Sequence, residues 1–143
     1  MTAEAKTAQP NFILLYVDSP KGSGDFYTSL LGREPVETSP TFVMFALEGG
    51  LMLGLWSRHT VKPVPAATGG GSEIGIAVDD AAAVDTACAA WKARGVKIIQ
   101  EPTEMDFGRT FVGLDPDGHR VRVFAPAQEE GGPDEGAPQA GAR

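Results

Sequence analysis

Hydrophobic and polar positions follow the same order twice along this chain. The first copy opens with an uninterrupted apolar run, FILLYV at residues 12–17, which is typical of a buried strand. Ser19-Pro20 comes next, a helix-capping residue followed by proline at the first helical position. Apolar residues then recur at helical spacing as far as Gly32, so a helix is predicted to end there.

A predicted β-hairpin completes this first copy. After Pro40, the segments TFVMFALE and LMLGLW are joined at Gly49-Gly50, a dipeptide typical of tight turns. Later in the chain, RTFVGLD and HRVRVF are joined in the same way by Pro116-Asp117-Gly118.

The second copy begins with the strand EIGIAV at residues 73–78. Asp79-Asp80 follows as a helix cap, and the helix is expected to run to about Arg94, with Gly95 as its stop. Residues 96–100 then predict a short strand ahead of the second hairpin.

The two copies align residue by residue. Asp18 and Asp79 lie 61 positions apart, and segments 41–56 and 109–124 lie 68 apart throughout. Such a repeat predicts two similar βαβββ modules and therefore an α+β fold. One helix covers only one face of each sheet, so the remaining faces are expected to curve around a shared cavity.

Composition suggests where this domain begins and ends. Residues 1–10 are small and polar and predict a flexible N-terminus, while the acidic, Gly- and Pro-rich residues 127–143 predict a disordered tail. Residues 11–126 are then one domain. Its modules span about 11–56 and 73–126, and the Pro- and Gly-rich residues 57–72 link them.

Charge and cysteine content limit the possible partners. The 143 residues carry a net charge of −7, which argues against binding nucleic acid or an anionic membrane surface. Cys88 is the single cysteine, so no intrachain disulfide can form. No apolar run reaches the length of a membrane span, and the start has no signal-peptide core. We expect a cytoplasmic protein.

Three segments in order resemble the vicinal oxygen chelate superfamily, which includes glyoxalase I, extradiol dioxygenases and bleomycin-resistance proteins. They are FILLYVDSPKGSGDFYTSLLG, EIGIAVDD and FVGLDPDGHRVRVF, the last with a DPDG hairpin typical of that superfamily. The resemblance covers about residues 12–124. It implies paired βαβββ modules, commonly assembled as a homodimer.

The resemblance also implies where metal ligands would stand in metal-dependent members. The matching positions here are Phe12, Gly54, Glu73 and Arg122, and only the glutamate can bind a divalent cation well. One carboxylate cannot build the three- or four-ligand site of a catalytic metal. The chain therefore resembles the metal-free drug-binding resistance proteins most, and we expect no cofactor.

Strand alternation indicates what lines the cavity in place of metal ligands. The lining is aromatic and apolar, with a gap at Gly54 and a few charges, and it suits a flat ligand held by stacking. Glu73 and Arg122 are expected to orient its polar groups or to pair with each other. The candidate ligand-binding residues are Phe12, Tyr16, Phe45, Met52, Gly54, Trp56, Glu73, Phe107, Arg122 and Phe124.

Other chemistry-bearing residues have plainer interpretations. Trp91 and Cys88 lie on the apolar side of the second helix and are expected in the core. His59 is expected to be solvated in the linker, and His119 to be structural in its turn. Met105 and Phe107 precede a strand and could form a lid.

Three hypotheses on function follow. The first is a metal-free small-molecule binding protein, a homodimer that sequesters or carries an aromatic antibiotic or related natural product. The second is a lyase, isomerase or dioxygenase of the same superfamily, using a metal or Glu73 as a base. The third is an interaction subunit whose concave face meets another chain.

Overall fold

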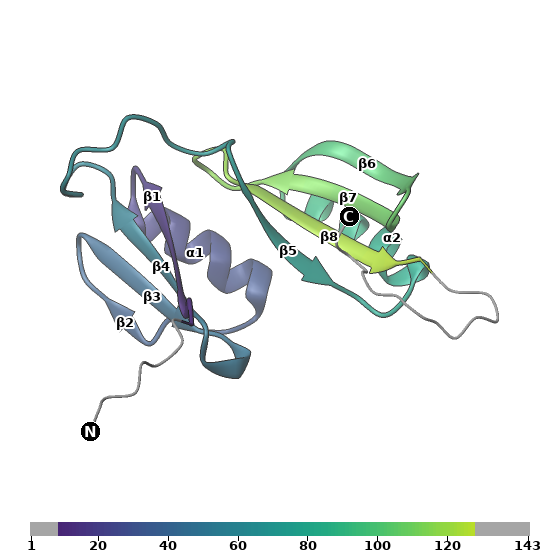
Figure 1. The fold of residues 1–143 in the computed structure, drawn as a ribbon, viewed down its shortest axis with the longest axis horizontal. Helices are drawn as coiled ribbons and strands as arrows, with labels where there is room; N and C mark the ends of the chain where they lie inside the picture. Colours follow the sequence, from purple (N-terminus) through teal and green to yellow (C-terminus); the bar gives the residue numbers. More distant parts are fainter. Residues whose placement is uncertain (1–8, 128–143) are drawn as a thin grey trace, which may run out of the picture. The chain divides into compact units, whose positions relative to one another are not determined.

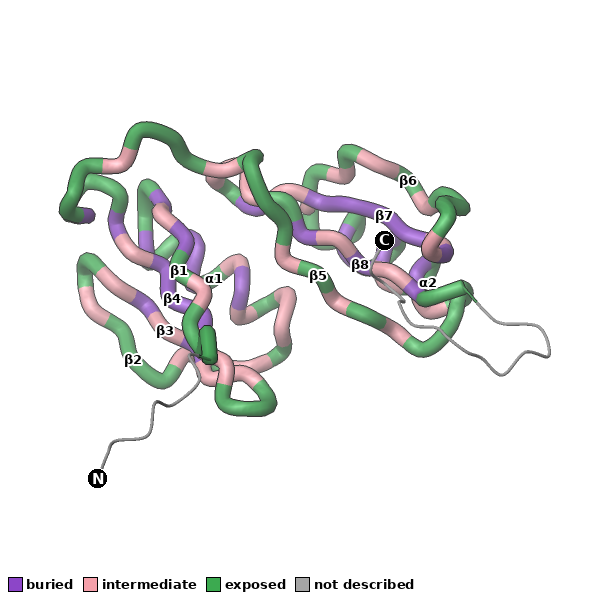
Figure 2. Tube along the Cα trace, in the orientation of Figure 1, coloured by how far each residue is buried: buried purple, intermediate pink, exposed green. Residues whose placement is uncertain are grey.

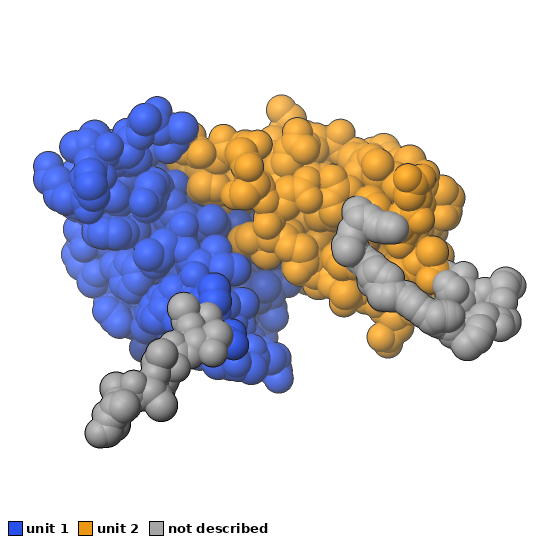
Figure 3. Space-filling model, in the orientation of Figure 1, with its two compact units in different colours: residues 1–67 blue, residues 68–143 orange. Residues whose placement is uncertain are grey.

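The computed structural model describes residues 9–127 of the 143, and these fall into two compact units that divide between Ala67 and Thr68 (Figures 1 and 3). Each unit contains one four-stranded sheet and one α-helix. The predicted α+β fold of two repeated modules is confirmed. The expected flexible N-terminus and acidic tail fall largely on residues 1–8 and 128–143, which lie outside the described residues.

The first unit has the sheet order β1-β4-β3-β2. Strand β1 runs parallel to β4, and the other neighbours are antiparallel. Its elements are β1 (Phe12–Val17), α1 (Pro20–Leu31), β2 (Glu37–Thr38), β3 (Phe42–Ala46), the 3₁₀ turn η1 (Glu48–Gly50) and β4 (Met52–Ser57).

The ends of α1 are where the sequence predicts them. The Ser19 hydroxyl accepts a hydrogen bond from the backbone N–H of Gly22 at 3.0 Å, and Pro20 is the first helical residue. Gly32 ends the helix in the left-handed conformation, with φ of 68°, which glycine adopts without a Cβ penalty.

Helix α1 packs on one face of this sheet and buries the core of the unit. Buried residues alternate with less buried ones along β3 (Figure 2), as a sheet covered on one face requires. The core residues are fully or almost fully buried: Val17, Tyr27, Val43, Phe45, Leu53 and Leu55.

The second unit has the matching sheet order β5-β8-β7-β6. Strand β6 is longer than the short strand predicted, and its pairing with β7 shifts register twice, on either side of Gln100. Pro102 fits this edge strand because it has no N–H to donate. The elements are β5 (Glu73–Ala77), α2 (Ala81–Ala93), β6 (Lys97–Met105), β7 (Gly108–Leu114) and β8 (Arg120–Pro126).

Helix α2 covers one face of the second sheet. The Asp80 carboxylate caps it by accepting the backbone N–H of Ala83 at 2.9 Å. Trp91 packs edge-on against Phe111, with ring centroids 4.9 Å apart, and Cys88 is buried beside it. Burial raises the pKa of the Cys88 thiol. The prediction that Trp91 and Cys88 belong to the core is confirmed.

Strand pairing shows that the two units repeat the same sheet with the same register. Met44 pairs with Gly54 in the first sheet, and Val112 pairs with Arg122 in the second. The residue numbers differ by 68 for both partners, which is the offset predicted from the sequence. The segment between β4 and β5, residues 58–72, contains no helix or strand, although Val61 within it is buried. No helix among the described residues has both the length and the apolarity to cross a membrane.

The β3–β4 connection differs from the tight turn that Gly49-Gly50 suggested. A two-residue turn there would place Phe45 opposite Gly54. The observed turn includes the 3₁₀ segment Glu48–Gly50, so Ala46 pairs with Met52 and Met44 with Gly54. A shift of one residue moves every side chain of a strand to the other face. Phe45 therefore faces α1, and Phe42 takes the opposite face.

We expect the substitution Phe45→Ala to lower the free energy of unfolding by about 3–5 kcal/mol, because it empties a fully buried site. Phe42→Ala should cost clearly less, because that ring is only partly buried. Urea denaturation of both variants measures the difference. Equal losses would contradict the observed register.

Candidate functional site

The face of each sheet that points away from its helix holds most of the predicted site residues. We call these the open face of sheet 1 and the open face of sheet 2, and each is described by itself. On sheet 1 the register of β1, β3 and β4 places nine residues there. They are Phe12, Leu14, Tyr16, Phe42, Met44, Ala46, Met52, Gly54 and Trp56.

Three aromatic residues form a row across the open face of sheet 1. Trp56 on β4 pairs with Tyr16 on one side and with Phe42 on the other. The Tyr16 and Trp56 rings meet edge to face, with centroids 6.2 Å apart and planes at 80°. Phe12 and Leu14 are 49% and 44% exposed on the same face. The face is therefore apolar, aromatic and partly open to solvent.

Gly54 does not leave the empty gap that the sequence suggested. A Cβ built there would lie 2.7 Å from the Phe42 ring and 2.8 Å from the Leu14 side chain. The glycine instead lets these two side chains close over the strand. The floor of the open face is thus made by Phe42 and Leu14.

Phe45 was predicted to bind the ligand, and the structure corrects this. It is fully buried on the α1 side, so it belongs to the core. Phe42 and Met44 are on the open face and were missed. The sequence TFVMFALE predicts a strand whose alternate residues face opposite sides of the sheet. Which of them face the helix depends on the geometry of the following turn, and the Gly-Gly dipeptide alone did not specify that geometry.

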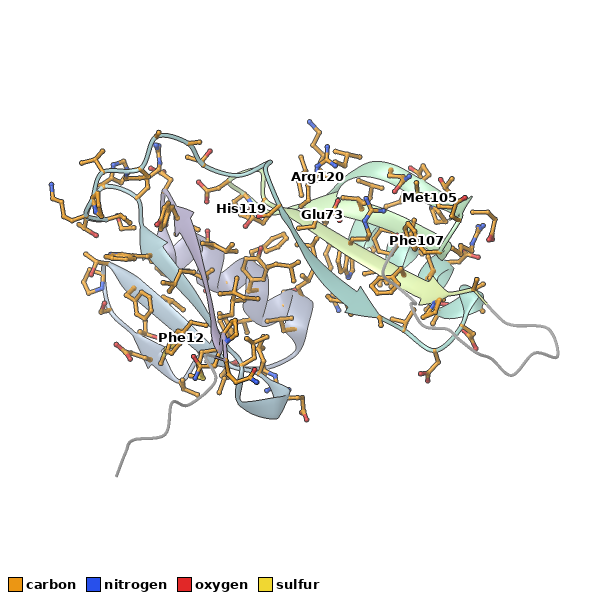
Figure 4. The ribbon with its side chains drawn as sticks, viewed as in Figure 1. Phe12, Glu73, Met105, Phe107, His119 and Arg120 are labelled. Carbon is orange, nitrogen blue, oxygen red and sulfur yellow. The ribbon has the colours of Figure 1, made fainter. Side chains whose placement is uncertain are left out.

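An ion pair dominates the open face of sheet 2. The Glu73 carboxylate accepts hydrogen bonds from Nε and a terminal nitrogen of Arg122, at 2.8 and 2.9 Å. This is the bidentate geometry that favours arginine over lysine. Arg120 approaches the same carboxylate at 3.7 Å (Figure 4). Glu73 and Arg122 were expected to pair, and both belong to this one sheet.

The other terminal nitrogen of Arg122 is also engaged. It donates to the Gln100 side-chain oxygen at 3.0 Å and to the Thr110 hydroxyl oxygen at 3.2 Å. Thr110 is fully buried and donates its own hydroxyl to the Val123 carbonyl at 2.8 Å. The guanidinium of Arg122 is therefore fixed in place by three side chains. Gln100 and Thr110 were not predicted as site residues, because nothing in the sequence shows which polar residues face an arginine two strands away.

Two phenylalanines lie beside this ion pair. Phe107, between β6 and β7, packs edge-on against Phe124 at a centroid distance of 6.1 Å. The Arg122 guanidinium carbon lies 5.9 Å from the Phe107 ring centroid, within cation–π range. The structure thus brings Glu73, Phe107, Arg122 and Phe124 together on sheet 2. Phe107 is packed onto that face, and Gln100 contacts the sulfur of Met105 nearby.

Electrostatics keep Glu73 ionised. The hydrogen bonds from Arg122 hold the pKa of this carboxyl below its ordinary value. Partial burial acts in the opposite direction, but its effect is smaller. A carboxylate with a lowered pKa, with both oxygens engaged, is a weak proton acceptor. This arrangement disfavours Glu73 as a catalytic base.

The residues at the family's metal positions do not fit a divalent cation. Phe12 and Gly54 supply no donor atom, and the one carboxylate, Glu73, is bound by Arg122. Within residues 9–127, no group of three or more His, Cys, Asp or Glu side chains gathers in a way that could hold a metal ion.

The two histidines lie outside the strands, each beside an aspartate of its own unit. The His59 ring is exposed, as expected, and it also lies within 2.7 Å of the Asp18 carboxylate, which Arg58 contacts at 3.3 Å. The hydrogen bond with His59, and then the charge of Arg58, lower the pKa of Asp18. The backbone N–H of His119 donates to Asp115 at 2.8 Å in the β7–β8 turn.

Two surface grooves lie outside the open faces. One, of about 710 Å³, is lined by α1, β2, β3 and the residues between them, and the other, of about 560 Å³, by the start of α2 and the ends of β6, β7 and β8. Neither is lined by an aromatic side chain. They suit a planar aromatic ligand less well than the open face of sheet 1.

Comparison with known proteins agrees with this fold and with the order of these elements. The family model of the glyoxalase/bleomycin resistance protein/dioxygenase superfamily matches residues 9–123. The chain belongs to this superfamily.

Individual proteins with a similar sequence or fold include two that are named for antibiotics. The phenazine antibiotic resistance protein EhpR of Enterobacter agglomerans is 37% identical over 122 residues, covering 82% of this chain and 92% of its own. The solution structure of ATC0852 from Agrobacterium tumefaciens is 52% identical with a TM-score of 0.79, covering 85% of this chain and all of that one. TnmS3, an antibiotic binding protein from Streptomyces, shares the fold at 22% identity and a TM-score of 0.67, covering 87% of this chain and all of its own.

The Glu73–Arg122 pair should make stability depend on pH. Because the pKa of Glu73 is lowered in the folded state, its contribution is present above the ordinary value of 4.5 and is lost as pH falls through the folded value. We expect Glu73→Gln to cost about 1 kcal/mol or more at pH 7 and less at pH 3. Urea denaturation between these pH values measures it.

A matched control is Glu48→Gln, which removes an exposed carboxylate paired with Arg33 in the first unit. That pair should contribute little at any pH. A loss in Glu73→Gln that is the same at pH 7 and pH 3 would contradict the assigned role of the ion pair.

Proposed function

We propose that this protein binds a planar aromatic natural product of the antibiotic type and holds it without converting it. Such a protein confers resistance by sequestering the compound, or carries it. The observation that supports this most directly is the Tyr16–Trp56–Phe42 row on the open face of sheet 1. Aromatic side chains offer a flat ligand a large contact area at a small entropic cost.

The exposure of this face adds to the argument. Phe12 and Leu14 leave about half of their surface in water, which is unfavourable unless something covers them. A stacked ring system would cover these side chains and gain the free energy of removing their apolar surface from water. The proposal assigns Phe12, Tyr16, Met52 and Trp56 to ligand contact, and adds Phe42.

The relatives favour the same class of ligand. EhpR is named for resistance to a phenazine antibiotic, and a phenazine is a flat, fused aromatic system. The superfamily name itself includes bleomycin resistance. We therefore propose a phenazine-like compound as the ligand, bound by a cytoplasmic homodimer.

Binding without a metal is part of the proposal. The four family positions hold two residues without donors and a closed Glu–Arg pair. The same pair argues against the enzyme alternative with Glu73 as a base, because the lowered pKa of Glu73 weakens it for proton abstraction.

The stacking role of Trp56 can be measured directly. We expect Trp56→Ala to weaken the affinity for phenazine-1-carboxylate at least tenfold, because a large aromatic contact is lost. In Trp91→Phe, Trp56 is the only tryptophan, and its fluorescence should be quenched on titration with the same compound.

Val64→Ala serves as a control, since Val64 is highly exposed on the segment between β4 and β5. Its affinity should equal that of the wild type. Wild type and Trp56→Ala binding equally well would overturn the stacking role, and no binding of any planar aromatic probe would overturn the proposed function.

Metal independence has its own test. We expect Zn²⁺, Ni²⁺, Mn²⁺ and Fe²⁺ to leave the affinity for phenazine-1-carboxylate unchanged within twofold, because the family positions offer no chelating set. Calorimetric titration with and without each metal, together with elemental analysis of the purified protein, measures this. A stoichiometric metal whose removal abolishes binding would reverse the conclusion.

A further inference from the structure

We infer that Gly54 makes the site on sheet 1 selective for fully flat ring systems, although the glycine itself lies too deep to touch a ligand. This inference rests on the proposed function and deepens it. It narrows the ligand class to fused aromatic rings that have no tetrahedral atom in the central ring. Gly54 is thus a positioning residue, and it acts through Phe42 and Leu14.

Gly54 stands at the centre of the open face of sheet 1. It lies on β4, between β1 and β3, and pairs with Leu14 on one side and with Met44 on the other. Phe42 is two residues from Met44 along β3, so its ring reaches Gly54 diagonally. The ends of the Leu14 and Phe42 side chains meet over the glycine, which is buried beneath them.

These two side chains rest directly on the backbone of β4. A Cβ at Gly54 would lie 2.7 and 2.9 Å from two atoms of the Phe42 ring and 2.8 Å from a methyl carbon of Leu14. The backbone itself is paired with a strand on each side, and Leu53 and Leu55 are buried on the opposite face. The floor of the site therefore has no space to recede into when a ligand presses on it.

A floor that cannot recede favours a ligand without out-of-plane atoms. A flat fused system can approach Phe42 and Leu14 along its whole face, and Phe42 is also part of the aromatic row with Trp56. A tetrahedral atom in the central ring folds the system, so part of the ligand stands away from the floor. A gap of about 0.5–1 Å already forfeits about a quarter to a half of the dispersion attraction between facing atoms.

An alanine at this position would make the floor uneven. Its Cβ needs about 1 Å more room than it has, because carbon atoms in contact stay about 3.5–4.0 Å apart. The atoms that block it are the far ends of the Phe42 and Leu14 side chains, which can move outward without disturbing the strand. The displaced ring then projects toward the ligand. The substitution therefore changes the surface of the site more than it changes the fold.

The test compares acridine with 9,10-dihydroacridine, which share three fused rings and differ in the planarity of the central one. We expect the wild type to bind acridine about tenfold more tightly, at a pH where both compounds are uncharged. In Gly54→Ala the affinity for acridine should fall about tenfold and that for dihydroacridine at most about twofold, so the preference is largely lost. Calorimetric titration measures both affinities, and urea denaturation checks that the variant is folded.

Gly75→Ala is the matched control. Gly75 is also a strand glycine on an open face, but it belongs to sheet 2, where it pairs with Arg122. A Cβ there would meet only Phe124, at an ordinary contact distance of 3.5 Å. This variant should keep both affinities and the preference for acridine.

A double variant shows whether Gly54 acts through Phe42. In Phe42→Leu the shorter side chain no longer reaches the place of the Cβ, and only the contact with Leu14 remains. Adding Gly54→Ala to Phe42→Leu should therefore weaken acridine binding about threefold instead of tenfold, as coupled residues require.

The possible failures are distinct. Equal binding of the two compounds by the wild type would overturn this inference and leave the proposed function standing. The role of Gly54 would be overturned by an undiminished preference in Gly54→Ala, by equal effects with and without Phe42→Leu, or by a Gly54→Ala variant that does not fold. Failure of the wild type to bind acridine, phenazine-1-carboxylate or any other planar probe would overturn both the inference and the proposed function.

Discussion

A sheet covered by a single helix buries only one of its faces, and this constraint governs both halves of the protein. In each unit the helix takes the alternate residues that build the core, and the intervening residues are left without a covering element. Those residues are therefore not required to pack against a helix. In the first unit they have become aromatic, with Phe12 and Leu14 half exposed, and in the second they have become a charged cluster around Glu73. The scaffold is repeated, but the two exposed surfaces have separate chemistry.

Equivalent positions show how far the two surfaces have diverged. Gly54 and Arg122 share one place in the repeat, as do Trp56 and Phe124. The glycine lets Phe42 and Leu14 close over its strand, while the arginine forms a bidentate pair with a carboxylate on the next strand. Neither arrangement leaves a donor free to join a cation site. At the positions that the family resemblance assigns to the ligands of metal-dependent members, this chain has apolar contact in one module and a closed ion pair in the other.

Local signals in the sequence were sufficient for the elements and the repeat, but not for strand register or long-range polar contacts. Ser19, Gly32 and Asp80 act within a few residues of themselves, so helix ends could be predicted from neighbours alone. The face taken by Phe45 depended on the conformation of a turn several residues away, and a change of one residue there reversed it. The contact of His59 with Asp18 joins residues 41 apart, and Gln100 reaches Arg122 across two strands. Neither contact could be predicted from the spacing of these residues along the sequence.

The two cores take a large aromatic ring from different elements. Strand β7 has Gly113 where β3 has Phe45, and Trp91 from α2 comes within contact distance of that glycine. One unit therefore supplies the large ring from its sheet, and the other supplies it from its helix. A recombinant module that combined α2 with the first sheet would press Trp91 against Phe45, which dense interiors do not tolerate. This mismatch means that α2 could not replace α1 on the first sheet without repacking of the core, so the two helices are not interchangeable.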